Sequence, residues 1–311
     1  HTTWTEIRKL MVDGDPHRWD TQAYFVNPYA RKDGQYSASL SVQTRLMEPR
    51  NDVPNGSETF LTLLPQMAKI LASIPRVSRN PRLIPKILED GFGIFTAERE
   101  VEGLSHDMLG QHFYGFPPRG IGLEFTLPYA TPGAHAQSAE FVDALIEQIE
   151  LMRRSDRFVG GYISIRFTKR WDAHLSLSYG SDTCFVELLM LHGTPRGRET
   201  LIELEQNLRA WNPRMHFGLL QATTRDEVTK AYPALPVFQR VRALMDPEEV
   251  FANGLSDRVG ITGRPVRRVL DPVAPMTRDF AHEPAHPRSA RRVPVEFGKP
   301  VHRLGGHRPY A

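Results

Sequence analysis

The stretch Ile121-Gly122-Leu123-Glu124-Phe125-Thr126-Leu127 decides the fold, because apolar side chains alternate in it with small or polar ones. Successive side chains of a β-strand point to opposite faces of the sheet. The alternation therefore predicts a strand with one dry face and one polar face, and it places Glu124 on the polar face.

The residues that follow this strand complete the order β-α-β-β-α-β. The further predicted elements are strands at Val159–Thr168, Thr183–Leu191 and Met215–Gln221, a helix capped by Ser138 and ending at Arg154, and a helix from Arg198 to Trp211. This order is typical of the split βαβ, or ferredoxin-like, unit, in which both helices cover one face of an antiparallel sheet. We therefore expect an α+β fold with a ferredoxin-like core at about residues 119–221, and we expect the functional side chains on the open face.

The regions that flank this core are less regular. The pattern predicts a strand at residues 37–47 and helices at 58–74 and within 226–251, the last with Val237, Phe238, Val241 and Leu244 on its apolar face. After Gly260, eight of the chain's 25 prolines and ten basic residues fall in the last fifty positions. We expect residues 1–261 to form a substrate-binding domain and residues 262–311 to form an extended Pro/Arg-rich tail or arm.

Composition excludes several classes of protein. The 311 residues carry a net charge of +3. Residues 262–311 contribute ten basic and four acidic side chains, or +6, so residues 1–261 carry 3 − 6 = −3. This mildly acidic body lacks the basic stripe of a nucleic-acid partner. No apolar run is long enough to span a bilayer, and the lone Cys184 forbids an intramolecular disulfide, so we expect a cytoplasmic protein.

One group of polar side chains can carry chemistry on the open face. Strand alternation places Arg166 and Ser164 there, together with Glu124, Glu187 and His216, as one row across the sheet. An arginine flanked by carboxylates can hold an anion, orient a hydroxyl group or stabilise developing charge. The alternative is a structural ion pair at a domain contact.

The sequence does not support three other kinds of site: a zinc site, a nucleophile elbow and a dinucleotide-binding loop. The string His282-Glu283-Pro284-Ala285-His286 matches a zinc-protease motif, but Pro284 interrupts the helix that the motif requires, so we expect no metal site. No nucleophile-elbow string occurs, and Cys184 lies in an apolar strand. The glycines of Arg119–Leu123 lead into a strand rather than a helix, so they do not form a dinucleotide loop.

Four spaced segments together resemble the C-terminal half of the vanillyl-alcohol-oxidase type flavoproteins. They are Arg119–Pro128, Gly161–Phe167, Trp211–Gly218, and the set Tyr232-Pro233, Phe238, Asp246-Pro247 and Phe251-Ala252-Asn253. The nearest subgroup is the sugar-lactone and alditol oxidases, with the cholesterol-oxidase substrate domain as a neighbour. The resemblance covers roughly residues 20 to 260 and implies a substrate, or cap, domain that lies over the flavin of FAD.

The resemblance also implies roles for single residues. Arg166 matches the arginine near the flavin, and His216 begins the segment that in the family reads His-Trp-Gly-Lys. Tyr162 lies in the matching strand, and Asn253 falls in a matching segment that we assign to cofactor binding. Ser164 and Leu219 stand where sugar-oxidising members have a glutamate and a lysine, which implies a more apolar pocket than a sugar site.

These observations favour the substrate-binding part of an FAD-dependent oxidoreductase that moves hydride from an alcohol carbon to flavin. The expected partners are an FAD-binding domain or subunit, on a preceding segment or a separate chain, and a small-molecule alcohol. We expect Arg166 to stabilise charge, Glu187 or Glu124 to orient it, and His216 to accept a proton. The alternatives are a non-catalytic binding or assembly subunit that docks a partner through its open sheet face, and a stand-alone small-molecule binder.

Overall fold

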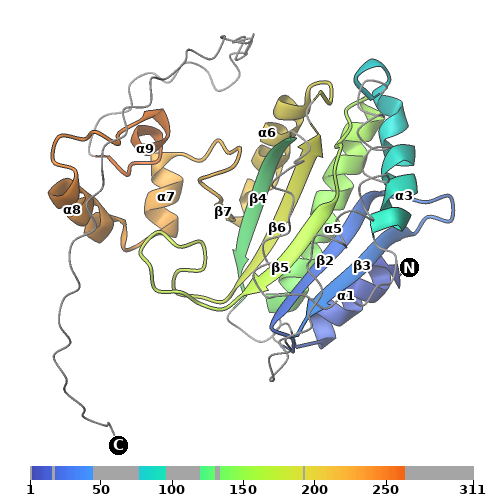
Figure 1. Ribbon diagram of the computed structural model, residues 1–311, viewed down its shortest axis with the longest axis horizontal. Helices are drawn as coiled ribbons and strands as arrows, with labels where there is room; N and C mark the ends of the chain where they lie inside the picture. The colour runs from blue at the N-terminus through green and yellow to red at the C-terminus, as the bar shows by residue number, and fades with distance from the viewer. Residues whose placement is uncertain are drawn as a thin grey trace, which may run out of the picture. The chain divides into compact units, whose positions relative to one another are not determined.

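A computed structural model describes residues 2–15, 18–44, 77–95, 120–129, 134–191 and 193–262, which lie within one compact unit. Its centre is a seven-stranded sheet in the order β1-β3-β2-β5-β6-β4-β7 (Figure 1). The strands are β1 (Thr2–Thr3), β2 (Thr21–Ala30), β3 (Tyr36–Gln43), β4 (Gly120–Pro128), β5 (Ile163–Thr168), β6 (Thr183–Leu191) and β7 (Arg214–Met215). The helices are α1 (Trp4–Asp13), α3 (Ile84–Phe95), α5 (Ala134–Arg154), α6 (Gly197–Asn207), α7 (Arg225–Ala231), α8 (Leu235–Met245) and α9 (Gly254–Arg258).

All strand pairs in this sheet are antiparallel, and with the helices they confirm the α+β class. Strand β4 pairs with β6 and β7, and β5 pairs with β6. The sheet is larger than the four-stranded one predicted, because β2 pairs with β5 and brings β3 and β1 with it. The assignment of the β4-to-β7 region to the ferredoxin-like unit stays a prediction.

Two strand boundaries differ from the prediction. Strand β5 begins at Ile163 rather than Val159, because the backbone of Val159 exchanges hydrogen bonds with the Tyr29 hydroxyl: its N–H donates at 2.7 Å and its carbonyl accepts at 3.2 Å. The fourth predicted strand, residues 215–221, is wrong beyond Met215. The chain turns there, since the Leu219 N–H donates to the carbonyl of His216 at 3.2 Å.

Helix predictions were right in place and partly wrong in detail. Helix α5 ends at Arg154 as expected, but it starts at Ala134, so Ser138 is a buried residue inside the helix and not its cap. Helix α8 occupies the predicted position within 226–251. Two residues of its apolar face are not buried, since Val241 is 50% exposed and Leu244 is 82% exposed.

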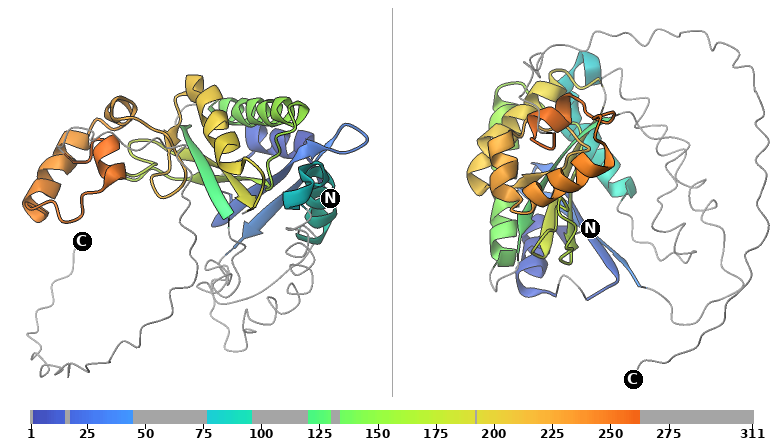
Figure 2. Two further views of the ribbon diagram at one scale, coloured as in Figure 1. Left: turned by 90° about the horizontal axis from the view of Figure 1, so that it is seen from above. Right: turned by 90° about the vertical axis from the view of Figure 1, so that its left-hand side faces the viewer.

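Helices cover the two faces of the sheet unequally. Helices α1, α5 and α6 lie on one face, where side chains such as Phe125 of β4 and Phe141 of α5 make edge-to-face contact at 5.1 Å between ring centroids (Figure 2, left). Helix α3 lies on the other face, near β2 and β3, where Glu89 accepts hydrogen bonds from Asn27 at 2.7 Å and Ser37 at 2.8 Å. Among the described helices, α3 is thus the one that covers part of this second face, beside β2 and β3.

Several predictions fall outside the described residues: the helix at 58–74, the histidine string at 282–286, and the tail beyond residue 262. Strand β3 corresponds to the strand expected at 37–47. Helices α1 and α3 and strand β2 were not predicted. Among the described helices, none combines the length and the hydropathy that crossing a bilayer requires.

Candidate functional site

The sheet register brings the predicted polar side chains together on the face opposite α5. Glu124 of β4 pairs with Glu187 of β6, and Glu187 pairs with Ser164 of β5, so these three side chains form one row. Arg166 belongs to the next row, where its partner is Phe185. The single row expected from the sequence is thus two adjacent rows.

Arg166 bridges these rows through one nitrogen. Its Nη2 donates to Glu124 Oε1 at 2.6 Å and to Glu187 Oε2 at 3.0 Å. The Arg166 side chain is 46% exposed, while the side chains of Glu124 and Glu187 are 4% and 19% exposed. We call Arg166, Glu124, Glu187 and the nearby His216 the arginine cluster.

The electrostatics of this cluster centre on Glu124. Burial raises the pKa of Glu124 above its ordinary value, the nearby Arg166 opposes that rise, and the neighbouring Glu187 adds to it. Two carboxylates that face each other across a strand pair repel. Arg166 therefore supplies the positive charge that lets both acids stay ionised side by side.

His216 reaches the cluster through the turn that ends β7. Its N–H donates to the Glu124 carbonyl at 3.3 Å, and its Nε2 lies 4.0 Å from Glu124 Oε2. Its Nδ1 accepts the N–H of Gly218 at 3.0 Å. A neutral imidazole that accepts at Nδ1 carries its proton on Nε2. In that state Nε2 is a donor that faces the cluster, and the role of His216 as proton acceptor stays a prediction.

The other predicted site residues have mixed outcomes. Ser164 lies in the row of Glu187. Tyr162 does not join the cluster, because its hydroxyl donates to the Leu88 carbonyl of α3 at 2.8 Å. Asn253 is likewise engaged, since its side-chain oxygen accepts the N–H groups of Leu255 and Ser256 and so caps α9. Its predicted contact with a cofactor gains no support from this geometry.

Leu219 lies beside the arginine cluster. Next to it lie Gly122 and Leu189, which the sequence did not identify as site residues. A Cβ atom placed on Gly122 would meet a Leu189 methyl at 3.2 Å and Leu219 methyls at 3.2 and 3.4 Å. Leu189 is 51% exposed. The alternation of β6 could have identified it, because Leu189 shares the phase of Glu187.

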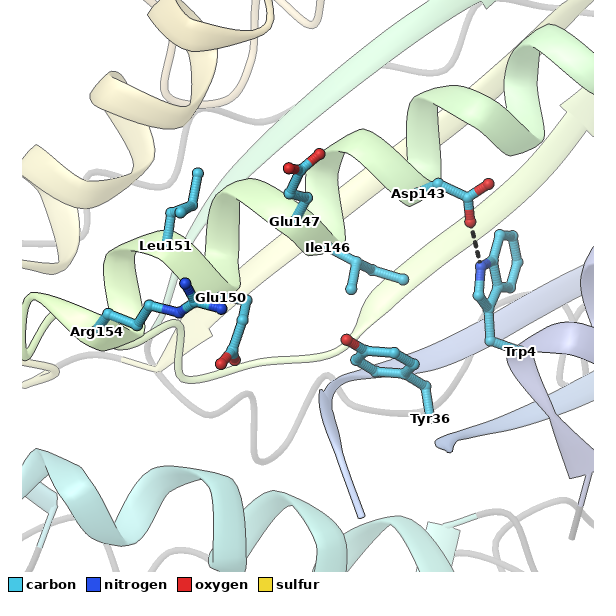
Figure 3. A pocket seen from close by; sticks show the side chains of 8 residues that line it. All are labelled: Trp4, Tyr36, Asp143, Ile146, Glu147, Glu150, Leu151 and Arg154. Atoms are coloured by element: carbon cyan, nitrogen blue, oxygen red, sulfur yellow. Dashed lines mark hydrogen bonds between the residues drawn. The ribbon is translucent and has the colours of Figure 1, made fainter. Parts of the chain in front are cut away.

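A separate cavity of about 340 Å³ lies on the helix-covered face, between α1, β3 and α5 (Figure 3). Its Trp4 indole N–H donates to Asp143 at 2.6 Å, and Asp143 also accepts from Arg8 at 2.8 Å. Glu150, which lines it too, pairs with Arg153. The bonds of Asp143 join α1 to α5 and the pair of Glu150 lies within α5, so we place the chemistry at the arginine cluster. Within the described ranges no group of three His, Cys, Asp or Glu side chains is arranged to hold a metal ion.

Comparison with known proteins confirms the resemblance to FAD-linked oxidases. Residues 125–259 match the family model described as D-arabinono-1,4-lactone oxidase. A curated relative, the L-gulono-1,4-lactone dehydrogenase of Mycobacterium tuberculosis, is 26% identical over 272 residues, which cover 80% of this chain and 52% of the relative. The alditol oxidase of a Streptomyces species is 27% identical over 158 residues, or 51% of this chain and 36% of that protein.

Solved structures give a looser likeness. A crystal structure of cholesterol oxidase from B. sterolicum has a TM-score of 0.48 and 16% sequence identity, and the match covers 76% of this chain and 53% of that one. The chain spans about half the length of the first curated relatives that it matches.

Proposed function

We propose, from the D-arabinono-1,4-lactone oxidase family domain at residues 125–259, that this chain is the substrate-binding part of an FAD-dependent oxidoreductase acting on an alcohol carbon. FAD is the cofactor of this family. One observation carries the proposal: Arg166, a half-exposed cation, is fixed by two acidic side chains on the part of the sheet face that α3 leaves uncovered.

The described residues around Arg166 suit the flavin ring of FAD. Both ion pairs of Arg166 use Nη2, and its Nε and Nη1 have no protein acceptor among the described residues. These N–H groups suit the carbonyl edge of a flavin ring, and the partly buried rings of Phe25 and Phe185 offer flat apolar surface on the same face. The described residues offer no glycine loop before a helix for the diphosphate. As the family resemblance implies, we propose that the diphosphate is bound by an FAD-binding domain or subunit.

The chain's own residues divide the work of substrate binding. Arg166 would hold the substrate oxygen and stabilise negative charge that develops on it. Glu187 is the better proton acceptor, because its side chain is 19% exposed against 4% for Glu124, and only its Oε2 is used by Arg166. His216 would donate from Nε2 and fix the orientation of the hydroxyl. When bound, FAD supplies the acceptor for the hydride that leaves the alcohol carbon.

The test uses the native protein that contains this chain. It should carry flavin absorbance, and Arg166→Ala should lower kcat/KM for alcohol oxidation, measured per bound flavin, by about 10²–10³. Arg170→Ala is the matched control, since Arg170 is exposed and pairs with Asp172 outside the cluster.

Two results would refute the proposal: absence of flavin from the complete assembly, or unchanged turnover in Arg166→Ala. If the protein lacks flavin but co-purifies with a protein that Arg166→Ala releases, the alternative of a non-catalytic docking subunit is correct.

A further inference from the structure

We infer that the substrate carries its reacting hydroxyl on an apolar body, and that Leu189 and Leu219 bind this body. This inference rests on the proposed function and adds the substrate class to it. It comes from the contacts beside the arginine cluster.

The two leucines form one apolar surface. They approach each other over Gly122, whose missing side chain leaves them just enough room, as the 3.2 Å distances to a Cβ atom there indicate. Two backbone hydrogen bonds hold Leu219 in place: its own N–H donates to the His216 carbonyl, and the N–H of Leu220 donates to the Gly122 carbonyl at 2.9 Å. Leu189 nevertheless stays 51% exposed, so the surface is available to a ligand. We call Leu189, Leu219 and Gly122 the leucine shelf.

The leucine shelf adjoins the reacting groups. Gly122 pairs with Leu189, and Glu124 pairs with Glu187, so the shelf and the two acids occupy successive rows on one face. Rows on the same face are about 7 Å apart, twice the rise of a strand residue. A ligand whose hydroxyl contacts Glu187, in the row next to the shelf, can therefore rest its carbon skeleton on Leu189 and Leu219.

Among the described residues, few groups outside the arginine cluster could bind a hydroxyl beside the leucine shelf. Thr126 and Thr183 share the face, but their hydroxyls donate to the carbonyls of Arg214 and Ser181 at 2.9 and 3.0 Å. Among the described residues, Ser164 is the neutral hydroxyl that remains beside the cluster. A polyol laid over the shelf would lose water from hydroxyl groups that find no partner, which is costly, whereas an apolar body gains from the same burial.

The test compares cyclohexanol with myo-inositol, which shares the ring but bears a hydroxyl on every carbon. In the flavin-loaded protein we expect a higher kcat/KM for cyclohexanol. Leu189→Ser and Leu219→Ser should each lower the cyclohexanol-to-inositol ratio by about tenfold or more. Leu151→Ser is the matched control, because Leu151 is 45% exposed on α5, on the other face of the sheet.

A second readout needs no turnover. Leucine methyl resonances in NMR spectra of this chain should shift for Leu189 and Leu219 when cyclohexanol is added, and should stay in place for Leu151 and for added inositol. Methyl shifts without any flavin in the native protein would support the inference and refute the proposed function. Flavin-dependent alcohol oxidation with unmoved methyls and an unchanged substrate ratio would refute the inference alone.

Discussion

Replacing Arg166 with alanine should destabilise the protein by an amount that depends on pH. Removing one partner of a fully buried ion pair costs about 3–5 kcal/mol, because the other charge stays buried without compensation. Glu124 is 4% exposed but Arg166 is 46% exposed, so water already screens part of the attraction. Allowing for that screening, we expect Arg166→Ala to lower the free energy of unfolding by about 2 kcal/mol near neutral pH.

The sign of the pH dependence follows from Glu124. Burial raises its pKa in the folded protein above the ordinary value of 4.5. A carboxyl group with a raised pKa favours folding less as pH rises from its unfolded value through its folded value, because the unfolded state loses the proton first. Without Arg166 the folded pKa rises further. The difference between wild type and variant should therefore be small at low pH and grow as Glu124 ionises.

Urea unfolding followed by tryptophan fluorescence at about pH 4 and pH 8 measures this difference. In a Glu124→Gln background, which keeps the shape and removes the charge, the effect of Arg166→Ala should fall below about 1 kcal/mol at both pH values. Equal destabilisation at the two pH values, or an undiminished effect in the Glu124→Gln background, would show that Arg166 does not compensate Glu124.

Three further predictions concern the surrounding structure. Glu205, 1% exposed, accepts the Ala222 N–H at 2.7 Å, so Glu205→Ala should lower the free energy of unfolding by about 1–3 kcal/mol in urea titrations. Tyr29→Phe should cost a similar amount, about 1–3 kcal/mol by the same assay, because the Val159 N–H then loses its acceptor. Burial raises the pKa of the Cys184 thiol to about 12, so a thiol reagent at about pH 8 should label Cys184 only after denaturant is added; rapid labelling of the folded protein would contradict this.

The sequence predicts best the strands in which burial produces a regular pattern of apolar residues. Strands β4 and β6 carry alternating or continuous apolar residues and were placed almost to the residue. Strand β7 and the start of β5 were misplaced, because single hydrogen bonds from distant residues decide them, such as the one between Tyr29 and Val159. A partner 130 positions away does not change the local pattern of apolar and polar residues, so that pattern cannot predict it.

The same distinction applies to the candidate site: strand alternation predicts which residues share a face, but not the contacts that depend on turns or on distant helices. Strand phase alone placed Arg166, Glu124 and Glu187 on one face, and the structure brings them within hydrogen-bond distance. The contacts of His216 depend on a turn where the sequence predicts a strand, so the hydrogen bond from the Gly218 N–H to its Nδ1 was not expected, and its role as proton acceptor stays a prediction. Tyr162 shares the right phase but lies under α3, a helix that the sequence analysis did not predict.

The arginine cluster is better explained by chemistry than by stability. The interior of a sheet between β5 and β4 would accept apolar residues at these positions, and replacing a buried ion pair with well-packed apolar residues is often neutral or stabilising. The protein instead places two acids opposite each other, at Glu124 and Glu187, and needs a cation to keep them together. That cation is held by one nitrogen, and its Nε and Nη1 have no acceptor among the described residues. An arrangement that gains little for folding, yet fixes a donor and an acceptor beside an apolar shelf, is what binding and orienting an alcohol requires.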